Sequence, residues 1–183
     1  VNQFKNIKLI SQKNRGKGYA VQNGIKNAKG HYILIQDADL EYNPTDYIQM
    51  FNKLKFNKLA VYGSRYLDKN NKIRFKKLKN QEFLPFLFNF ILMFIFNLLF
   101  KKRITDLLTG YKLYEKSFFN KVIINSKGFE ADHEITIKLI KLNYKIVEVP
   151  ISYLPRTRKE GKKINILDSF KAIKTIFFFK FFD

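Results

Sequence analysis

Several residue types are missing or scarce in this chain of 183 residues, and each absence excludes a kind of protein. The chain has no cysteine, which excludes a disulfide framework and any cysteine-ligated metal site. Its two histidines, His31 and His133, are too far apart in sequence to suggest a paired-histidine metal site. Neither the G-x-x-x-x-G-K-[ST] motif of phosphate-binding loops nor the G-x-S-x-G motif of serine hydrolases is present.

Acidic residues are also few, with 15 Asp and Glu against 35 Lys and Arg, so the formal net charge is +20. Such a charge attracts nucleic acid, anionic lipid head groups and phosphorylated substrates alike. Lysine, asparagine, isoleucine and phenylalanine are all enriched, as A/T-rich codons would make them, so the total charge is a weak guide. The apolar fraction of 46% excludes a disordered tail, and the length suits one domain with a buried core.

The first third of the chain alternates between strand and helix patterns. Short apolar runs predict strands over residues 7–10, 32–35 and 59–62, and helical periodicity predicts helices over 19–28 and from Pro44 onward. This alternation predicts an α/β fold with a parallel sheet and right-handed crossovers. Beyond it we expect a loop over 68–82, helices over 116–125, 131–142 and 164–182, and a strand over 145–149.

Two aspartates and an arginine follow predicted strands. Asp37 and Asp39 come directly after the run 32–35, and Arg65 follows the run 59–62. Ligands of such sheets lie beyond the carboxyl ends of the strands. Divalent cations such as Mg²⁺ prefer oxygen ligands and often bridge a carboxylate to substrate phosphates, and Glu41 could supply a third oxygen. The alternative is a pair of solvated loop aspartates.

The basic residues allow two interpretations as well. Arg65 could hold a phosphate in bidentate fashion, or it could be a surface arginine in the turn after a strand. A loop with Arg156, Lys162 and Lys163 could fold over an anionic ligand, although a solvated charge run is the simpler interpretation in so basic a chain. Acidic residues over 130–134 suit a helix N-terminus, because they complement the helix dipole.

Six segments, taken in order, resemble the motifs of family 2 glycosyltransferases, and within them of the dolichyl- or polyprenyl-phosphate sugar synthases. The segments are 14–20, 37–44, 61–65, 105–112, 128–134 and 148–163. Each motif is weak alone, but six in the right order are hard to obtain by chance. The resemblance implies a GT-A fold, in which a Rossmann-like, mostly parallel sheet flanked by helices binds a nucleotide sugar.

The resemblance also implies roles for individual residues. Asp37, Asp39 and Glu41 would hold a divalent cation, Mg²⁺ or Mn²⁺, together with the donor diphosphate. Arg65 and Arg156 would contact phosphates of the donor or acceptor. The remaining implied contacts to substrate or acceptor come from Lys17, Asp106, Lys162 and Lys163. Of the whole set, we assign catalysis to Asp39, Asp106 and Arg65.

One departure from the family concerns its beginning. The family starts with a strand of the V-x-I-P-x-Y-N-E type and a second strand carrying D-D-x-S, both of which bind the nucleotide base and ribose. Neither motif is present, and about 50 to 60 residues of the fold would be lacking, judged from the size of such units. We therefore expect residues 1–183 alone to be inactive.

The resemblance implies transfer of a mannose- or glucose-type hexose from a nucleotide sugar to a polyprenyl or dolichyl phosphate. The phosphate oxygen of such an acceptor is already anionic, so no strong general base is required, which suits the lack of a convincing catalytic histidine. Catalysis would rest on positioning and charge neutralisation, and in-line attack would invert the anomeric configuration.

Residues 83–100 form a run of 18 residues without charge, just long enough to span a bilayer. Basic residues lie on both sides of this run, so they set no orientation. Because a span would split the site, we expect a helix lying in the membrane interface, with a buried core helix as the alternative. We divide the chain into a glycosyltransferase domain over 1–163 and a membrane-proximal helix over 164–183, and expect association with the cytoplasmic face of a membrane.

Three rival functions remain. The first is a family 2 transferase with another acceptor; processive polysaccharide synthases carry Q-x-x-R-W, and this chain has no tryptophan. The second is a nucleic-acid-binding module, but the aromatic residues lie in apolar runs rather than among Lys and Arg, so we expect no nucleic acid partner. The third is an inactive protein that only binds membrane. The sequence leaves the oligomeric state open.

Overall fold

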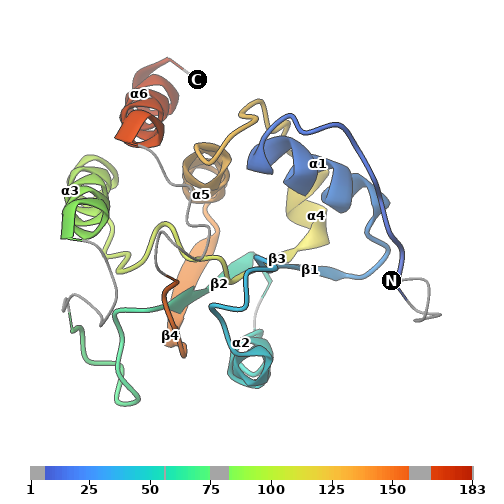
Figure 1. Ribbon diagram of the computed structural model, residues 1–183, viewed down its shortest axis with the longest axis horizontal. Helices are drawn as coiled ribbons and strands as arrows, with labels where there is room; N and C mark the ends of the chain where they lie inside the picture. Colours follow the sequence, from blue (N-terminus) through green and yellow to red (C-terminus); the bar gives the residue numbers. More distant parts are fainter. Residues whose placement is uncertain (1–6, 56, 75–82, 157–165, 183) are drawn as a thin grey trace.

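A four-stranded sheet with helices on both faces forms the centre of the protein (Figure 1). The structure is a computed structural model, and it describes residues 7–55, 57–74, 83–156 and 166–182. The strands are β1 (Tyr32–Ile35), β2 (Leu59–Ser64), β3 (Lys112–Glu115) and β4 (Lys145–Pro150). The helices are α1 (Lys17–Asn27), the 3₁₀ turn η1 (Pro44–Asp46), α2 (Tyr47–Phe51), α3 (Phe83–Phe100), α4 (Lys116–Phe119), α5 (Ala131–Lys141) and α6 (Ile166–Phe181).

The strands are ordered β1-β3-β2-β4. β2 and β4 are parallel, whereas β3 is antiparallel to both β1 and β2. The carboxyl ends of β1, β2 and β4 therefore lie at one edge of the sheet, where β3 begins. The predicted α/β sheet flanked by helices is confirmed, but its described strands form a mixed sheet, because the antiparallel strand β3 lies between β1 and β2.

Both faces of β2 are buried, which explains its continuous apolar run. Ala60 and Tyr62 pack with residues of α4 and α5 in one core cluster. Leu59 and Val61 pack on the other face, in a cluster that includes Met50 of α2. The alternation follows from the two-residue period of a strand, and it fixes the register of β2 between β3 and β4.

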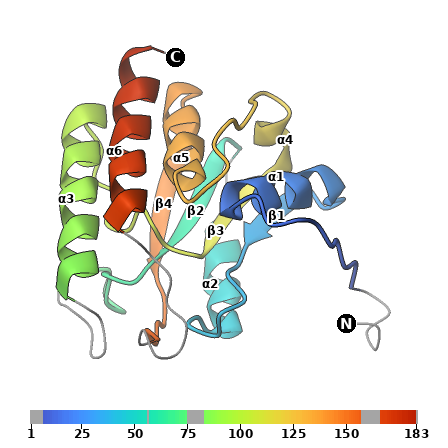
Figure 2. The ribbon, with the colours of Figure 1, turned by 45° about the horizontal axis from the view of Figure 1, so that its top comes forward.

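Helices α3, α6 and α5 lie side by side on one face of the sheet, with α2 on the opposite face (Figure 2). Their shared core contains Leu92 and Phe96 of α3, Ile137 of α5, and Ile176 and Phe179 of α6. The predicted helix over 83–100 is confirmed with the same bounds. The predicted helix over 164–182 is observed from Ile166 to Phe181.

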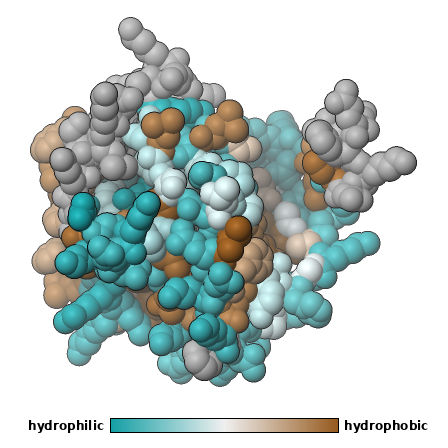
Figure 3. Space-filling model, turned by 90° about the horizontal axis from the view of Figure 1, so that it is seen from below, coloured by the Kyte–Doolittle hydropathy of each residue, from teal (hydrophilic) through white to brown (hydrophobic). Residues whose placement is uncertain are grey.

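The rest of α3 carries large apolar side chains that are exposed, among them Phe83, Leu84, Phe94 and Leu98. In the part of the chain that the structure describes, α3 is the one helix long and apolar enough to cross a membrane by length and composition, and 22% of it is buried. Seen from the α2 side, the surface is mainly hydrophilic, with hydrophobic residues along the flank on which α3 lies (Figure 3).

Two sequence-based predictions are wrong. Residues 7–10 form no strand; Ile7 and Leu9 are exposed, and the segment joins no sheet within the described residues. The helix predicted over 116–125 ends at Phe119. It does not continue because the backbone N–H groups of Asn125 and Ser126 donate to the Glu134 carboxylate, which draws the chain towards α5 instead.

Candidate active site

Charged residues from five parts of the chain converge at the edge where β1, β2 and β4 end. This follows from the topology, because residues after three strands and residues before the antiparallel β3 meet at that edge. The residues are Lys17 at the start of α1, Asp37, Asp39 and Glu41 after β1, Arg65 after β2, Asp106 before β3 and Arg156 after β4.

Arg65 and Asp106 form a bidentate ion pair. The Nε–Oδ2 and Nη2–Oδ1 distances are 2.6 and 2.7 Å, and the backbone N–H of Arg65 also donates to Oδ2 at 3.0 Å. Both side chains are buried. Burial alone would lower the pKa of Arg65, but the Asp106 carboxylate raises it well above its ordinary value, so the guanidinium stays charged. It lies 5.0 Å from the centre of the Tyr153 ring, within cation–π range.

The three carboxylates after β1 lie beside two basic side chains, Lys17 and Arg156. Asp37 lies 3.1 Å from the Lys17 ammonium, and Asp39 lies 3.1 Å from Nη2 of Arg156. Glu41 is buried and accepts hydrogen bonds from the Tyr153 hydroxyl at 2.8 Å and the Arg156 backbone N–H at 2.7 Å. The structure therefore places Asp39 and Glu41 around Arg156, while Asp37 faces Lys17.

A second charged layer lies behind Lys17. Asp132 of α5 is 2.7 Å from the buried Lys112 ammonium and 3.4 Å from Lys17. Burial would raise the pKa of Asp132, but the two lysines lower it to about 2. The sequence pattern explains Asp132 only as a complement to the helix dipole, and it assigns no role to Lys112. The one signal in the sequence was a lysine within the apolar run 111–114.

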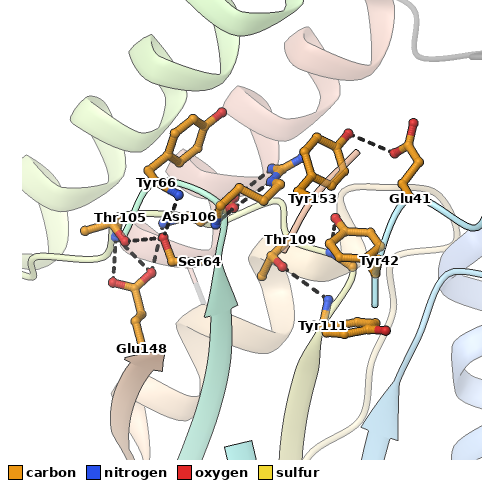
Figure 4. Close-up of polar contacts among 12 residues, drawn as sticks. Glu41, Tyr42, Ser64, Tyr66, Thr105, Asp106, Thr109, Tyr111, Glu148 and Tyr153 are labelled. Carbon is orange, nitrogen blue, oxygen red and sulfur yellow. Dashed lines mark hydrogen bonds and ion pairs between the residues drawn. The ribbon is translucent and has the colours of Figure 1, made fainter. Parts of the chain in front are cut away.

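Glu148 of β4 is another residue that sequence reasoning did not assign to the site. Its carboxylate accepts hydrogen bonds from the backbone N–H groups of Thr105, at 3.0 and 2.8 Å, and of Asp106, at 2.9 Å (Figure 4). The Thr105 hydroxyl in turn lies 2.7 Å from the Ser64 hydroxyl. β4 therefore holds the loop that presents Asp106 to Arg65.

Gly110 allows this loop to approach the aspartates. Its N–H donates to the Tyr42 hydroxyl at 2.8 Å, and the Tyr42 ring stacks on Tyr111 with 4.6 Å between ring centres. A Cβ atom at Gly110 would lie 2.6 Å from Oδ2 of Asp37 and 2.9 Å from the Tyr42 ring. Only glycine fits here without displacing Asp37 or Tyr42.

Two hollows lie beside the site. A groove of about 580 Å³ runs between α1 and β1 and reaches Lys17 and Asp37. On the other side of Asp106, a narrow, mainly apolar pocket is lined by Tyr66, Leu107 and α3 residues that include Phe86. The ion pairs therefore lie between a wide groove and an apolar pocket.

Asp37 and Asp39 could take part in holding a divalent cation only together with oxygen atoms of a bound ligand. The described residues form no group of three or more metal-binding side chains. Mg²⁺ is commonly held by one or two carboxylates plus substrate phosphates, however, and the side chains of Asp37 and Asp39 are 33% and 22% exposed. Glu41 is already engaged by Tyr153 and Arg156, so its metal-binding role stays a prediction. The predicted Lys162 and Lys163 lie outside the described residues.

Comparison with known proteins gives consistent results. Residues 1–123 match the model of glycosyl transferase family 2. An uncharacterized protein of Methanocaldococcus jannaschii is 30% identical over 92% of this chain and 70% of its own length. The dolichyl-phosphate beta-glucosyltransferase of Saccharomyces cerevisiae is 31% identical over 95% of this chain and 54% of its own length. The glycosyltransferase AglJ of Haloferax volcanii is 27% identical over 86% and 50%. The chain thus spans 50% of the length of AglJ, 54% of the length of the yeast enzyme and 70% of the length of the Methanocaldococcus protein.

Solved structures of glucosyl-3-phosphoglycerate synthase from Mycobacterium tuberculosis share the fold at 13% sequence identity. The complex with uridine diphosphate gives a TM-score of 0.67 and covers 93% of this chain and 57% of that one. The complex with Mn²⁺, UDP-glucose and glycerol 3-phosphate gives 0.60, over 92% and 56%. This likeness confirms the predicted fold class.

Proposed function

Because the chain belongs to glycosyl transferase family 2, we propose that it transfers a hexose of the glucose or mannose type from a nucleotide sugar to a polyprenyl or dolichyl phosphate. One observation carries this proposal. Four carboxylates and three cations from five parts of the chain meet at the strand ends. Asp39 pairs with Arg156, Asp37 with Lys17 and Asp106 with Arg65. Such a set of opposed charges suits two substrates that both carry phosphate.

The donor diphosphate would lie at Asp37 and Asp39, beside the groove along α1 and β1. A divalent cation held by these carboxylates would neutralise charge on the departing nucleoside diphosphate. The chain's own contribution there is positional: Lys17 and Arg156 hold the two carboxylates in place until the donor binds. When phosphate oxygens arrive, the same basic side chains can donate to them instead.

The acceptor phosphate would lie near Arg65 and Asp106. Two described features support this: side chains of α3 line a narrow apolar pocket together with Asp106, and other apolar side chains of α3 are exposed. The 31% identity to an enzyme named for dolichyl phosphate supports the same acceptor. The phosphate oxygen attacks the anomeric carbon as the diphosphate leaves, so no residue has to remove a proton.

The test is a transfer assay with the full-length protein in membranes. Radiolabelled UDP- and GDP-hexoses are offered together with polyprenyl phosphate, and label is measured in the organic phase. We expect label there, and Asp39→Asn should lower the rate at least about 100-fold, because charge stabilisation is lost at the leaving group. The matched control is Glu115→Gln, at the opposite end of β3, which should keep the rate.

Other outcomes would overturn parts of the proposal. Label that enters only a water-soluble phosphorylated acceptor would exclude the lipid acceptor. An unchanged rate in Asp39→Asn would remove the diphosphate site. No transfer from any nucleotide sugar would refute the proposal as a whole.

A further inference from the structure

We propose that Glu148 is a positioning residue, which holds Arg65 at the strand ends by fixing the backbone of Thr105 and Asp106. The inference rests on the proposed function only in giving Arg65 a phosphate to bind. Glu148 touches neither hollow of the site, so it would act entirely through the loop before β3.

The first step is the contact between Glu148 and the loop. One oxygen accepts from the N–H groups of both Thr105 and Asp106, at 3.0 and 2.9 Å, and the other accepts from Thr105 at 2.8 Å. Successive backbone N–H groups directed at one carboxylate fix the orientation of that peptide unit. The Glu148 carboxylate therefore bonds to the loop, whereas β4 pairs with β2 through backbone hydrogen bonds.

The second step leads from the loop to Arg65 by two routes. Asp106 receives the guanidinium at 2.6 and 2.7 Å and the Arg65 backbone N–H at 3.0 Å. Thr105 bonds through its hydroxyl to Ser64, the residue before Arg65, at 2.7 Å. Both the side chain and the backbone of Arg65 therefore depend on the peptide that Glu148 holds, as Figure 4 shows for the loop and Ser64.

The third step is that this connection depends on a proton. Burial raises the pKa of Glu148 to about 7. The Asp106 carboxylate also raises this pKa, whereas the hydrogen bonds from the loop N–H groups lower it. A protonated carboxyl carries an O–H donor and cannot accept with both oxygens as the ionised form does. The described titratable groups that influence Glu148 are Asp106, which is paired with Arg65, and Tyr62 of β2, whose pKa burial raises. Near neutral pH, the proton that changes this cluster is therefore that of Glu148.

NMR of the full isotope-labelled chain tests the connection without any substrate. We expect the amide signals of Thr105 and Asp106 and the Nε–H signal of Arg65 to titrate together with a midpoint near pH 7. Glu148→Gln should abolish this titration. The control is Glu134→Gln, since Glu134 also accepts from two backbone N–H groups, at 2.9 and 2.7 Å, but belongs to α5. This variant should keep the titration.

A second variant distinguishes the route through Asp106 from the route through Thr105 and Ser64. It also tests the proposal if Glu148→Gln does not fold. Ser64→Ala removes the hydroxyl bonded to Thr105, so the Thr105 and Asp106 amides should still titrate while the response of Arg65 shrinks by about half. The proposal is overturned if the wild-type Arg65 signal does not follow the two amides, or if the titration persists in Glu148→Gln.

Transfer assays then show whether the connection serves the proposed function. The wild-type rate should fall as the pH is lowered through about 7 and level off near the rate of Glu148→Gln, whose lower kcat should show no such decline. Coupled NMR titrations in a protein without transferase activity would refute the proposed function and leave the positioning role standing. Activity whose pH dependence is the same in wild type and Glu148→Gln would refute the positioning role.

Discussion

At the residue scale, the charges of the site are arranged in opposed pairs, each formed by residues far apart in sequence. Arg65 and Asp106 are 41 residues apart, and Arg156 and Asp39 are 117 apart. The paired state keeps buried charges compensated in the absence of substrate. Because the partners are in direct contact, a shift of one side chain also moves the side chain paired with it.

A substitution at Gly110 would displace one of these side chains, the Asp37 carboxylate. In Gly110→Ala the new methyl group would meet Oδ2 of Asp37, so we expect the transfer rate to fall about 10- to 100-fold through misplacement of that carboxylate. Gly24→Ala is the control, because a Cβ there meets nothing within 4 Å and should stabilise α1 slightly. Equal transfer rates in the two variants would show that Asp37 is not constrained by the loop.

His133 makes stability depend on pH. Burial lowers its pKa to about 4 from an ordinary 6.5, and both ring nitrogens lack hydrogen-bond partners among the described residues. The unfolded chain therefore binds a proton below about pH 6.5 that the folded chain takes up only near pH 4. Stability should fall by up to about 3 kcal/mol between these values. Urea unfolding of wild type and His133→Leu at pH 7 and 4.5 measures this loss, which the variant should lack; parallel losses would contradict the assignment.

The sequence allowed some of these residues to be predicted. Asp37, Asp39 and Arg65 could be placed at one sheet edge because each follows an apolar strand run. The partners of Lys112 and Glu148 could not be predicted, because a single charged residue within a strand carries no local pattern that names its partner. Those contacts exist only once β3 and β4 take their places in the sheet.

At the element scale, β3 is the feature that sequence patterns missed. It has four residues, and its alternation is obscured because Lys112, Leu113 and Tyr114 are all buried. The reverse error occurred at 7–10, where an apolar run suggested a strand that no described neighbour pairs with. Helix α3, by contrast, was predicted with its observed bounds, because an uncharged run of that length between basic segments has clear ends.

Asn97 connects α3 to the active-site loop. Its amide donates to the Ile104 carbonyl at 2.7 Å and accepts from the Ile104 N–H at 2.9 Å. We expect Asn97→Leu to lower the free energy of unfolding by about 1 to 3 kcal/mol, because both backbone groups lose their partner. Urea denaturation measures the change. Asn89→Leu, the same substitution in the same helix at a residue without a described hydrogen bond, should change it by less than about 0.5 kcal/mol.

At the scale of the whole molecule, exposed apolar side chains on α3 and α6 form a flank on one side of the sheet. They include Phe94 and Leu98 on α3, and Phe177, Phe178 and Phe181 on α6. The basic residues Lys101, Lys102 and Arg103 follow α3 directly. This combination supports the expectation that the protein associates with an anionic membrane surface.

Flotation with vesicles of phosphatidylcholine and phosphatidylglycerol tests that expectation. Phe94→Ser together with Phe178→Ser should lower the bound fraction at least about fivefold, since each removes a large apolar side chain from the interface. Ile48→Ser is the matched control, because Ile48 is 67% exposed on α2, on the opposite face of the sheet. Equal flotation of the two variants would place the membrane contact elsewhere.

Lys17 forms ion pairs with both a partly exposed and a buried carboxylate. Its ammonium is shared between Asp37 at the strand end and Asp132 in the first turn of α5. A cation that binds Asp37 would repel the Lys17 ammonium from that carboxylate, while Asp132, the other described carboxylate beside Lys17, already pairs with Lys112. Binding at the partly exposed Asp37 would then change the electrostatic environment of the buried Lys112–Asp132 pair at the start of α5.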